Sequence, residues 1–216
     1  MRIGILGTGM VGAAIGTKLV ALGHPVRLGA RSASSERAAA WATTQGANAS
    51  HGTFADAAAF GELVFNCTAG QASLDALTLA GAENLDGKIL VDVSNPLDFS
   101  RGMPPTLTVC NTDSLGEQIQ RAFPRLKVVK TLNTTNAYVM VNPAQVGGGD
   151  HTMFVCGNDA EAKASATRWL GEWFGWRDVI DLGDITTARG TEMLLPIWVR
   201  LMGALGTPMF NFKIVR

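Results

Sequence analysis

The chain has 216 residues, enough for one domain with a full hydrophobic core, and its 18 basic residues balance 18 acidic ones. This balance argues against a nucleic-acid partner or an anionic membrane surface, and no apolar run reaches the roughly 18 residues of a membrane span. Three cysteines without a CxxC pair argue against a disulfide framework. We therefore expect a cytoplasmic protein.

Apolar runs and amphipathic segments alternate along the chain. The first half predicts strands at 2–6, 25–30, 47–50, 62–68 and 88–94, separated by helices at 10–22, 36–45, 53–59 and 70–79. The second half predicts a helix at 114–122, strands at 126–132, 152–157 and 177–183, helices at 160–174 and 186–205, and an edge strand at 210–216.

Most of these strand runs are continuously apolar, which is typical of strands covered on both faces. Together with the alternation of strands and helices, this predicts an α/β fold with a doubly wound, mostly parallel sheet. We expect a single domain over 1–216, with a helical appendage at 183–216.

A glycine-rich turn lies between the first predicted strand and the first predicted helix. It reads Gly7, Thr8, Gly9, Met10, Val11, Gly12 and fits the GxGxxG pattern. Gly7 permits a tight turn, Gly9 lets the backbone approach a pyrophosphate, and Gly12 lets the helix pack against the strand. N–H groups at the helix start add a positive end. The turn therefore predicts dinucleotide binding.

The end of the second predicted strand indicates which dinucleotide is bound. NAD-binding domains of this type usually carry an acid there for the ribose hydroxyls, but this chain has Arg31 and Ser32. The guanidinium can grip a 2′-phosphate bidentately and the hydroxyl can donate to it. Arg37 either adds a second charge or is a solvated surface residue. We therefore predict NADP over NAD.

Several motifs resemble those of the NADP oxidoreductases that depend on the deazaflavin coenzyme F420. They are GTGMVG…LGARS, VFNCTAG, ILVDVSNPL, VVKTLNT and the closing LGDITTARGTEMLLPIWVRLMGALG, and the likeness covers nearly the whole chain. The domain is also similar to the N-terminal half of pyrroline-5-carboxylate reductases and to the reductase domain of membrane metalloreductases. The resemblance implies a Rossmann-type fold.

The resemblance also implies cofactor-binding residues. Thr8, Gly9, Met10 and Val11 would contact the pyrophosphate, and Arg31 and Ser32 the 2′-phosphate. Cys67, Thr68 and Ala69 would flank the adenosine and pyrophosphate side. Ser94, Asn95, Asn133 and Thr134 would lie beside the nicotinamide.

The implied function is hydride transfer between NADP(H) and a small-molecule acceptor, either coenzyme F420 or another flavin-like ring. We expect no catalytic acid or base, because the predicted nicotinamide side offers groups that do not titrate near neutrality. The three histidines form no metal-binding pattern, so we expect no metal.

Two other functions stay open. One is an NADPH-binding sensor or regulatory protein without turnover. The other is a small imine or ketone reductase, which would need a proton donor near the nicotinamide. Lys130 is the closest candidate, and strand alternation makes it as likely to face outward.

The C-terminal part carries two further expectations. In the polar segment 181–190, one interpretation is that Asp184 or Thr186 caps the following helix. The other is that Arg189 or Glu192 reaches the rim of the acceptor pocket, and both can hold together. The large apolar residues after 193 exceed what one terminal helix needs to cover a sheet face, which predicts a homodimer contact there.

Overall fold

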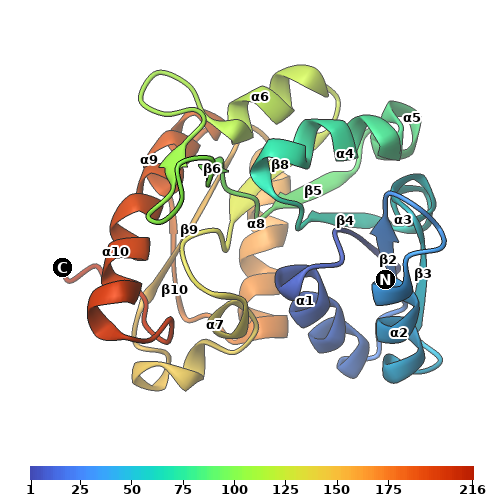
Figure 1. The fold of residues 1–216 in the computed structure, drawn as a ribbon, viewed down its shortest axis with the longest axis horizontal. Helices are drawn as coiled ribbons and strands as arrows, with labels where there is room; N and C mark the ends of the chain where they lie inside the picture. The colour runs from blue at the N-terminus through green and yellow to red at the C-terminus, as the bar shows by residue number, and fades with distance from the viewer.

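The computed structural model describes all 216 residues, and its centre is a sheet of eight strands (Figure 1). The strands are β1 Ile3–Leu6, β2 Val26–Ala30, β3 Ala49–Thr53, β4 Leu63–Asn66, β5 Ile89–Asp92, β8 Lys127–Thr131, β9 Thr152–Gly157 and β10 Asp178–Asp181. Their order across the sheet is β10-β9-β8-β5-β4-β1-β2-β3. All neighbours pair in parallel except β8 and β9. The predicted Rossmann-type, mostly parallel sheet is confirmed.

Helices cover both faces of the sheet. They are α1 Met10–Ala21, α2 Glu36–Gln45, α3 Phe54–Phe60, α4 Ser73–Ala80, α5 Ala82–Leu85, α6 Leu115–Ala122, α7 Ala137–Val141, α8 Ala160–Trp169, α9 Ala188–Met193 and α10 Leu195–Leu205. One core joins the sheet to α1, α2, α7 and α8, and a second joins it to α3, α4, α5, α6 and α9. None of these helices combines the length and apolar character needed to cross a membrane.

The alternation of side chains along β1 shows why the strand serves two cores. Ile3 and Ile5 belong to the core under α1, whereas Leu6 belongs to the core under α3 and α4. Gly4 also faces α3, where a Cβ would lie 2.2 Å from the carbonyl oxygen of Ala57. Strands buried on both faces need apolar residues at nearly every position, as the sequence predicted.

Short polar residues begin several helices where the sequence placed them. Ser35 caps α2, and Thr53 forms a capping box with Asp56 at the start of α3. The predicted helix at 160–174 is α8 followed by a π-helical turn over Leu170–Phe174. Asp184 caps the 3₁₀ turn Ile185–Thr187 that leads into α9.

The predicted edge strand at 210–216 is wrong. The tail runs without regular structure and contacts the sheet at Thr152, whose N–H donates to the carbonyl of Phe212 at 2.9 Å. Because β8 and β10 occupy both sides of β9, the tail reaches only the first residue of that strand.

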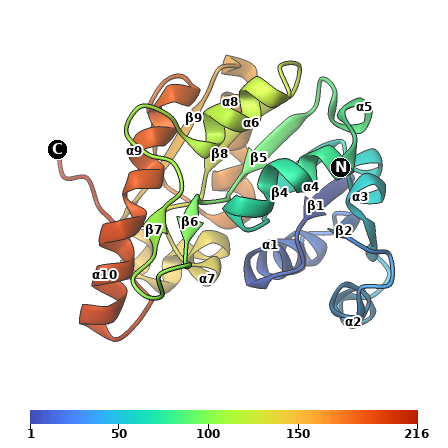
Figure 2. The same ribbon diagram turned by 45° about the horizontal axis from the view of Figure 1, so that its top comes forward.

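The sequence also missed the hairpin of β6 Leu97–Asp98 and β7 Thr106–Leu107, as well as helix α7. In Figure 1 and Figure 2 this hairpin lies on the side of the molecule that carries α9 and α10, away from α2. The hairpin and the C-terminal helices therefore frame one end of the carboxyl edge of the sheet.

Candidate functional site

The glycine-rich turn between β1 and α1 contains two glycines, Gly7 and Gly12, that the fold itself requires. A third, Gly9, could carry a side chain without meeting any protein atom. Gly7 has a φ of +115°, and a Cβ on it would lie 2.6 Å from the carbonyl oxygen of Cys67. A Cβ on Gly12 would lie 2.1 Å from the carbonyl oxygen of Gly7. A Cβ on Gly9 would meet nothing within 4 Å. Gly9 therefore borders open space, as a backbone that receives a ligand must.

The N-terminus of α1 opens into that space. Gly9 is its N-cap and offers no side-chain cap, and the first turn contains no acidic residue. The first N–H groups of a helix have no intrahelical acceptor, and together with the helix dipole they attract an anion. This helix start can therefore bind a phosphate group.

A cavity of about 660 Å³ extends from the turn over the end of β2. It is lined by Gly7, Thr8, Gly9, Gly29, Ala30, Arg31, Ser32, Ser35, Arg37, Phe54, Cys67, Thr68, Ala69, Ala72, Asp75, Ala76 and Leu79. Nine of these are residues predicted from the sequence: Gly7, Thr8, Gly9, Arg31, Ser32, Arg37, Cys67, Thr68 and Ala69. The sequence did not identify the apolar wall formed by Phe54, Ala76 and Leu79.

The cationic end of this cavity has no internal partner. Arg31 and Arg37 are both exposed, and neither is among the ion pairs of the structure. The hydroxyl of Ser32 lies 2.7 Å from that of Ser34. Two unpaired guanidinium groups and a serine pair can bind a phosphate monoester.

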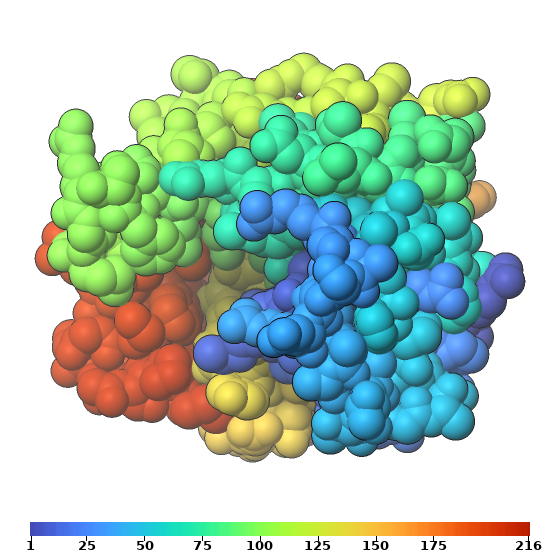
Figure 3. All heavy atoms as spheres, turned by 45° about the vertical axis from the view of Figure 1, so that its right-hand side comes forward, coloured from blue at the N-terminus to red at the C-terminus, as the bar shows by residue number.

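A second hollow of about 300 Å³ adjoins the first. It is lined by Val11, Cys67, Thr68, Ala69, Gly70, Gln71, Val93, Ser94, Asn95, Leu97 and Phe99, so Cys67, Thr68 and Ala69 border both hollows. Figure 3 shows the surface hollowed between the C-terminal part of the chain, the segment near residue 100 and the N-terminal part. The two hollows form a continuous path along the carboxyl edge of the sheet.

Met10, Asn133 and Thr134, which were also predicted, line neither hollow. Met10 is exposed at the first position of α1. Asn133 is buried and exchanges hydrogen bonds with Asn95. Thr134 is 1% exposed, and its hydroxyl has no hydrogen-bond partner. A buried hydroxyl without a partner is uncommon and indicates a missing ligand group or water.

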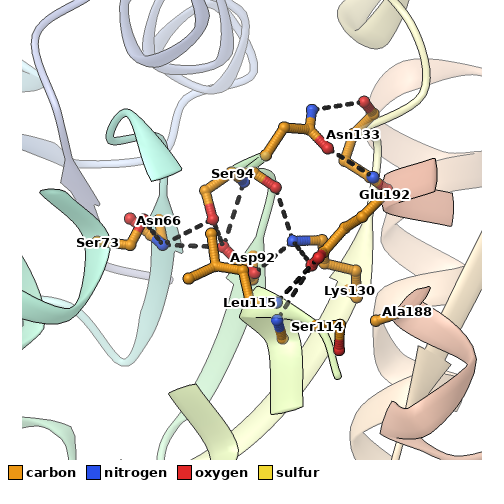
Figure 4. A network of polar contacts seen from close by, with 12 residues as sticks. Asn66, Ser73, Asp92, Ser94, Ser114, Leu115, Lys130, Asn133, Ala188 and Glu192 are labelled. Carbon is orange, nitrogen blue, oxygen red and sulfur yellow. Dashed lines mark hydrogen bonds and ion pairs between the residues drawn. The ribbon is translucent and has the colours of Figure 1, made fainter. Parts of the chain in front are cut away.

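Beneath the second hollow, three polar residues form a row across three adjacent strands. Asn66 of β4 is in register with Asp92 of β5, which is in register with Lys130 of β8. Asn66 Nδ2 donates to Asp92 Oδ1 at 2.8 Å, and Lys130 Nζ donates to Asp92 Oδ2 at 2.8 Å (Figure 4). Lys130 therefore faces inward, which decides the alternative that the sequence left open.

Glu192 of α9 completes this network from the C-terminal part of the chain. Its Oε1 lies 2.8 Å from Lys130 Nζ, and its carboxylate accepts the N–H groups of Leu115 and Gly116 at the start of α6. Burial lowers the pKa of Lys130, but the carboxylates of Asp92 and Glu192 outweigh it and raise the pKa to about 12. Lys130 is therefore a charged residue and not a proton donor near neutral pH.

The sequence suggested that Arg189 or Glu192 reaches the rim of the acceptor pocket. This is wrong for Glu192, because its side chain is 1% exposed and accepts the first N–H groups of α6 instead. Arg189 pairs with Glu117 of α6. A signal for the network was present in the sequence. The runs VFN, LVD and VVK each place one polar residue near the end of an apolar strand, and a buried charge requires a partner.

Comparison with known proteins identifies the relatives of this fold and site. The family described as "NADP oxidoreductase coenzyme F420-dependent" matches residues 2–96. A solved structure from Arthrobacter sp. FB24, described as a candidate F420-dependent NADP-reductase, is 58% identical with a TM-score of 0.96, and the match covers 100% of both chains. The chain belongs to the coenzyme F420-dependent NADP oxidoreductase family.

More distant relatives share the domain. Metalloreductase STEAP3 of Rattus norvegicus is 31% identical over 202 residues, which cover 91% of this chain and 38% of that protein. The reductive aminase of Aspergillus terreus, solved with NADPH and ethyl levulinate, shares the fold at 18% identity and a TM-score of 0.63, over 95% of this chain and 61% of that one. Family membership confirms the predicted resemblance and indicates an NADP-binding oxidoreductase.

Proposed function

We propose that this protein transfers a hydride between NADP(H) and a planar deazaflavin or flavin-like acceptor. The observation that carries the proposal is the continuous path from the unpaired guanidinium groups of Arg31 and Arg37, past the uncapped start of α1, to the strand ends at Ser94 and Asn95. The order of its cationic, backbone-amide and polar surfaces matches the order of the 2′-phosphate, pyrophosphate and nicotinamide in NADP(H).

The residues present fit this cofactor. Arg31, Ser32 and Arg37 would hold the 2′-phosphate, and the apolar wall of the larger cavity would contact the adenine. Gly9 and the start of α1 would hold the pyrophosphate, because no side chain fills that space. Ser94 and Asn95 line the second hollow and would hold the nicotinamide end, and Asn133 would support it through its hydrogen bonds to Asn95. Thr134 follows Asn133 in the chain, and its buried hydroxyl has no partner in the protein. The bound cofactor supplies the hydride chemistry.

The acceptor would lie over the nicotinamide end of the path. Phe99 and Leu97 of the β6–β7 hairpin line this hollow, and we propose that the C-terminal segment 183–216 forms its other wall. These are apolar surfaces suited to a flat ring system. Holding two rings in reactive contact and excluding water can supply about 7–11 kcal/mol of barrier lowering.

The Cys67 thiol is the one ionisable side chain in the lining of the second hollow. The other polar lining residues are Thr68, Gln71, Ser94 and Asn95. Burial and the nearby Asp92 carboxylate raise the pKa of the Cys67 thiol above its usual value. The three N–H groups of Lys130 are all engaged. We therefore propose that the accompanying proton comes from solvent and that no side chain acts as a general acid or base.

A screen of acceptors tests the function. Purified protein with NADPH is mixed with coenzyme F420, FMN, FAD or a ferric chelate, and the loss of nicotinamide absorbance is followed. Turnover with a deazaflavin or flavin, and none with an imine or ketone, supports the proposal. Tight NADPH binding without turnover on any acceptor would instead identify a sensor. Turnover on imines alone, with a rate that one point variant abolishes, would identify an imine reductase.

A further inference from the structure

The ammonium group of Lys130 holds the main chain of the strand end where the proposed nicotinamide site begins. Its Nζ donates to the carbonyl oxygen of Ser94 at 2.6 Å, in addition to the two carboxylates of Asp92 and Glu192. An ammonium has three N–H donors, so each donor has one acceptor. The side chain is 0% exposed and cannot touch a ligand in the hollow.

Asp92 also binds Ser94, through its carboxylate oxygen Oδ1. Its Oδ1 accepts the backbone N–H of Ser94 at 3.2 Å and the hydroxyl of Ser94 at 2.7 Å. Ser94 is thus fixed at its N–H, its hydroxyl and its carbonyl by two residues of adjacent strands. The residue that follows, Asn95, is fixed in turn by Asn133. The peptide between Ser94 and Asn95 therefore has little freedom to rotate.

The charged groups of this buried cluster indicate a role beyond packing the strands together. Asp92, Lys130 and Glu192 place two carboxyl groups against one ammonium group in a fully buried place, which is costly for a purely structural cluster. The two N–H groups at the start of α6 partly compensate Glu192. An apolar cluster would hold the strands together at a lower cost, but it could not direct a donor at the carbonyl of Ser94.

We propose that Lys130 is a positioning residue, which holds Ser94 and Asn95 in the shape that receives the nicotinamide half of NADP(H), and that Glu192 locks Lys130 in place. This inference rests on the proposed cofactor site. It also links the C-terminal segment to that site, because Glu192 lies on α9 and the strand end lies after β5.

The test separates the two halves of the cofactor. Both 2′,5′-ADP and NADPH reach the cavity at Arg31, but only NADPH reaches Ser94 and Asn95. The main variant is the double substitution Lys130→Met with Glu192→Gln, which removes the donor to Ser94 and keeps the net charge of the cluster unchanged. Lys130→Met alone leaves two buried carboxylates without their cation, so it is a measure of folding only.

Two variants serve as matched controls. Glu192→Gln alone keeps the contact between Lys130 and Ser94. Arg189→Gln removes the neighbouring ion pair between α9 and Glu117 of α6 without touching the strand end. Arg189→Gln should bind NADPH and 2′,5′-ADP within about twofold of the unchanged protein, since an ion pair with one partly exposed partner contributes little. Glu192→Gln is the reference for the double variant, because these two proteins differ only at Lys130. Dissociation constants come from fluorescence titration and calorimetry.

For the double variant we expect the dissociation constant of NADPH to rise about tenfold, which corresponds to losing one hydrogen bond to a charged donor. That of 2′,5′-ADP should stay unchanged, and the fluorescence of bound NADPH should shift. Equal weakening of both ligands, or NADPH affinity equal to that of Glu192→Gln, would overturn the inference. The proposed function is tested separately by turnover. If no acceptor were reduced, the proposed function would fall, but the binding results would still test the role of Lys130.

Discussion

Asn95 and Asn133 form a reciprocal pair across two strand ends that are separated by 38 residues of chain. Asn95 Nδ2 donates to the carbonyl oxygen of Asn133 at 2.8 Å, and Asn133 Nδ2 donates to Asn95 Oδ1 at 2.9 Å. The pair joins the segment after β5 to the segment after β8, the two strands that also carry the buried ion pair of Asp92 and Lys130. It therefore adds a second polar connection between these two adjacent strands.

Replacing Asn133 by Ala should lower the free energy of unfolding by about 1 kcal/mol, because Asn95 loses the donor to its amide oxygen. The Asn95→Ala variant should cost a similar amount. In urea unfolding, the double variant should be more stable than the sum of the single effects predicts, with a coupling of at least about 0.5 kcal/mol. Strict additivity would show that the two amides do not depend on each other.

Two glycines of the turn should respond in opposite ways to alanine. At Gly9 the φ of −76° suits any residue and a Cβ meets no protein atom, so Gly9→Ala should fold normally and bind NADPH weakly. At Gly12 a Cβ would meet the Gly7 carbonyl at 2.1 Å, so Gly12→Ala should lose about 1–3 kcal/mol of stability. Thermal unfolding and NADPH titration separate these outcomes. Unchanged NADPH affinity of Gly9→Ala would place the pyrophosphate elsewhere.

Arg31→Ala should raise the NADPH dissociation constant at least about tenfold and leave NADH binding nearly unchanged, because only NADPH carries the 2′-phosphate. Arg37→Ala should have a smaller effect in the same direction. Arg125→Ala, at a surface ion pair with Asp86, is the matched control and should change neither affinity. If Arg31→Ala weakens both cofactors equally, the side chain shapes the fold and does not select NADP.

The last helix should mediate a homodimer. Ile197 and Leu205 of α10 are 48% and 56% exposed, an unusual extent for large apolar residues on one helix. Light scattering at micromolar concentration should give a dimer mass, and Ile197→Glu should give a monomer. Leu22→Glu, at the end of α1, introduces the same charge at another exposed apolar position and should leave the dimer intact. A monomeric unchanged protein would contradict the expectation.

The residues that we propose for the phosphates could be selected from the sequence because their features are local. The turn at Gly7 to Gly12 and the strand end at Arg31 depend on backbone conformations and charges within a few residues, and the structure places both at one cavity. The network around Lys130 could not be predicted in the same way. Its contacts depend on strand register, and Lys130 and Glu192 are brought together only after β8 and α9 are placed.

The antiparallel direction of β9 was missed for a related reason. Its run Thr152–Gly157 is continuously buried, like the parallel strands, so its composition does not reveal its direction. The direction follows from the segment between β8 and β9, which leaves the chain at the edge where β8 ends, so that β9 begins there and runs antiparallel. The tail was misassigned because alternation alone indicates a strand, whereas the tail reaches only the start of β9, which already has a neighbour on each side.

The order of the strands also bears on how the chain is made. Residues 1–92 supply β3, β2, β1, β4 and β5 as one continuous half of the sheet, and β8 joins that half only at β5. During synthesis, β5 is therefore a temporary sheet edge, and Asp92 places a carboxylate on it before Lys130 exists. A charge on an open edge discourages pairing with a foreign strand. When β8 adds to β5, Lys130 pairs with this carboxylate and the edge is closed.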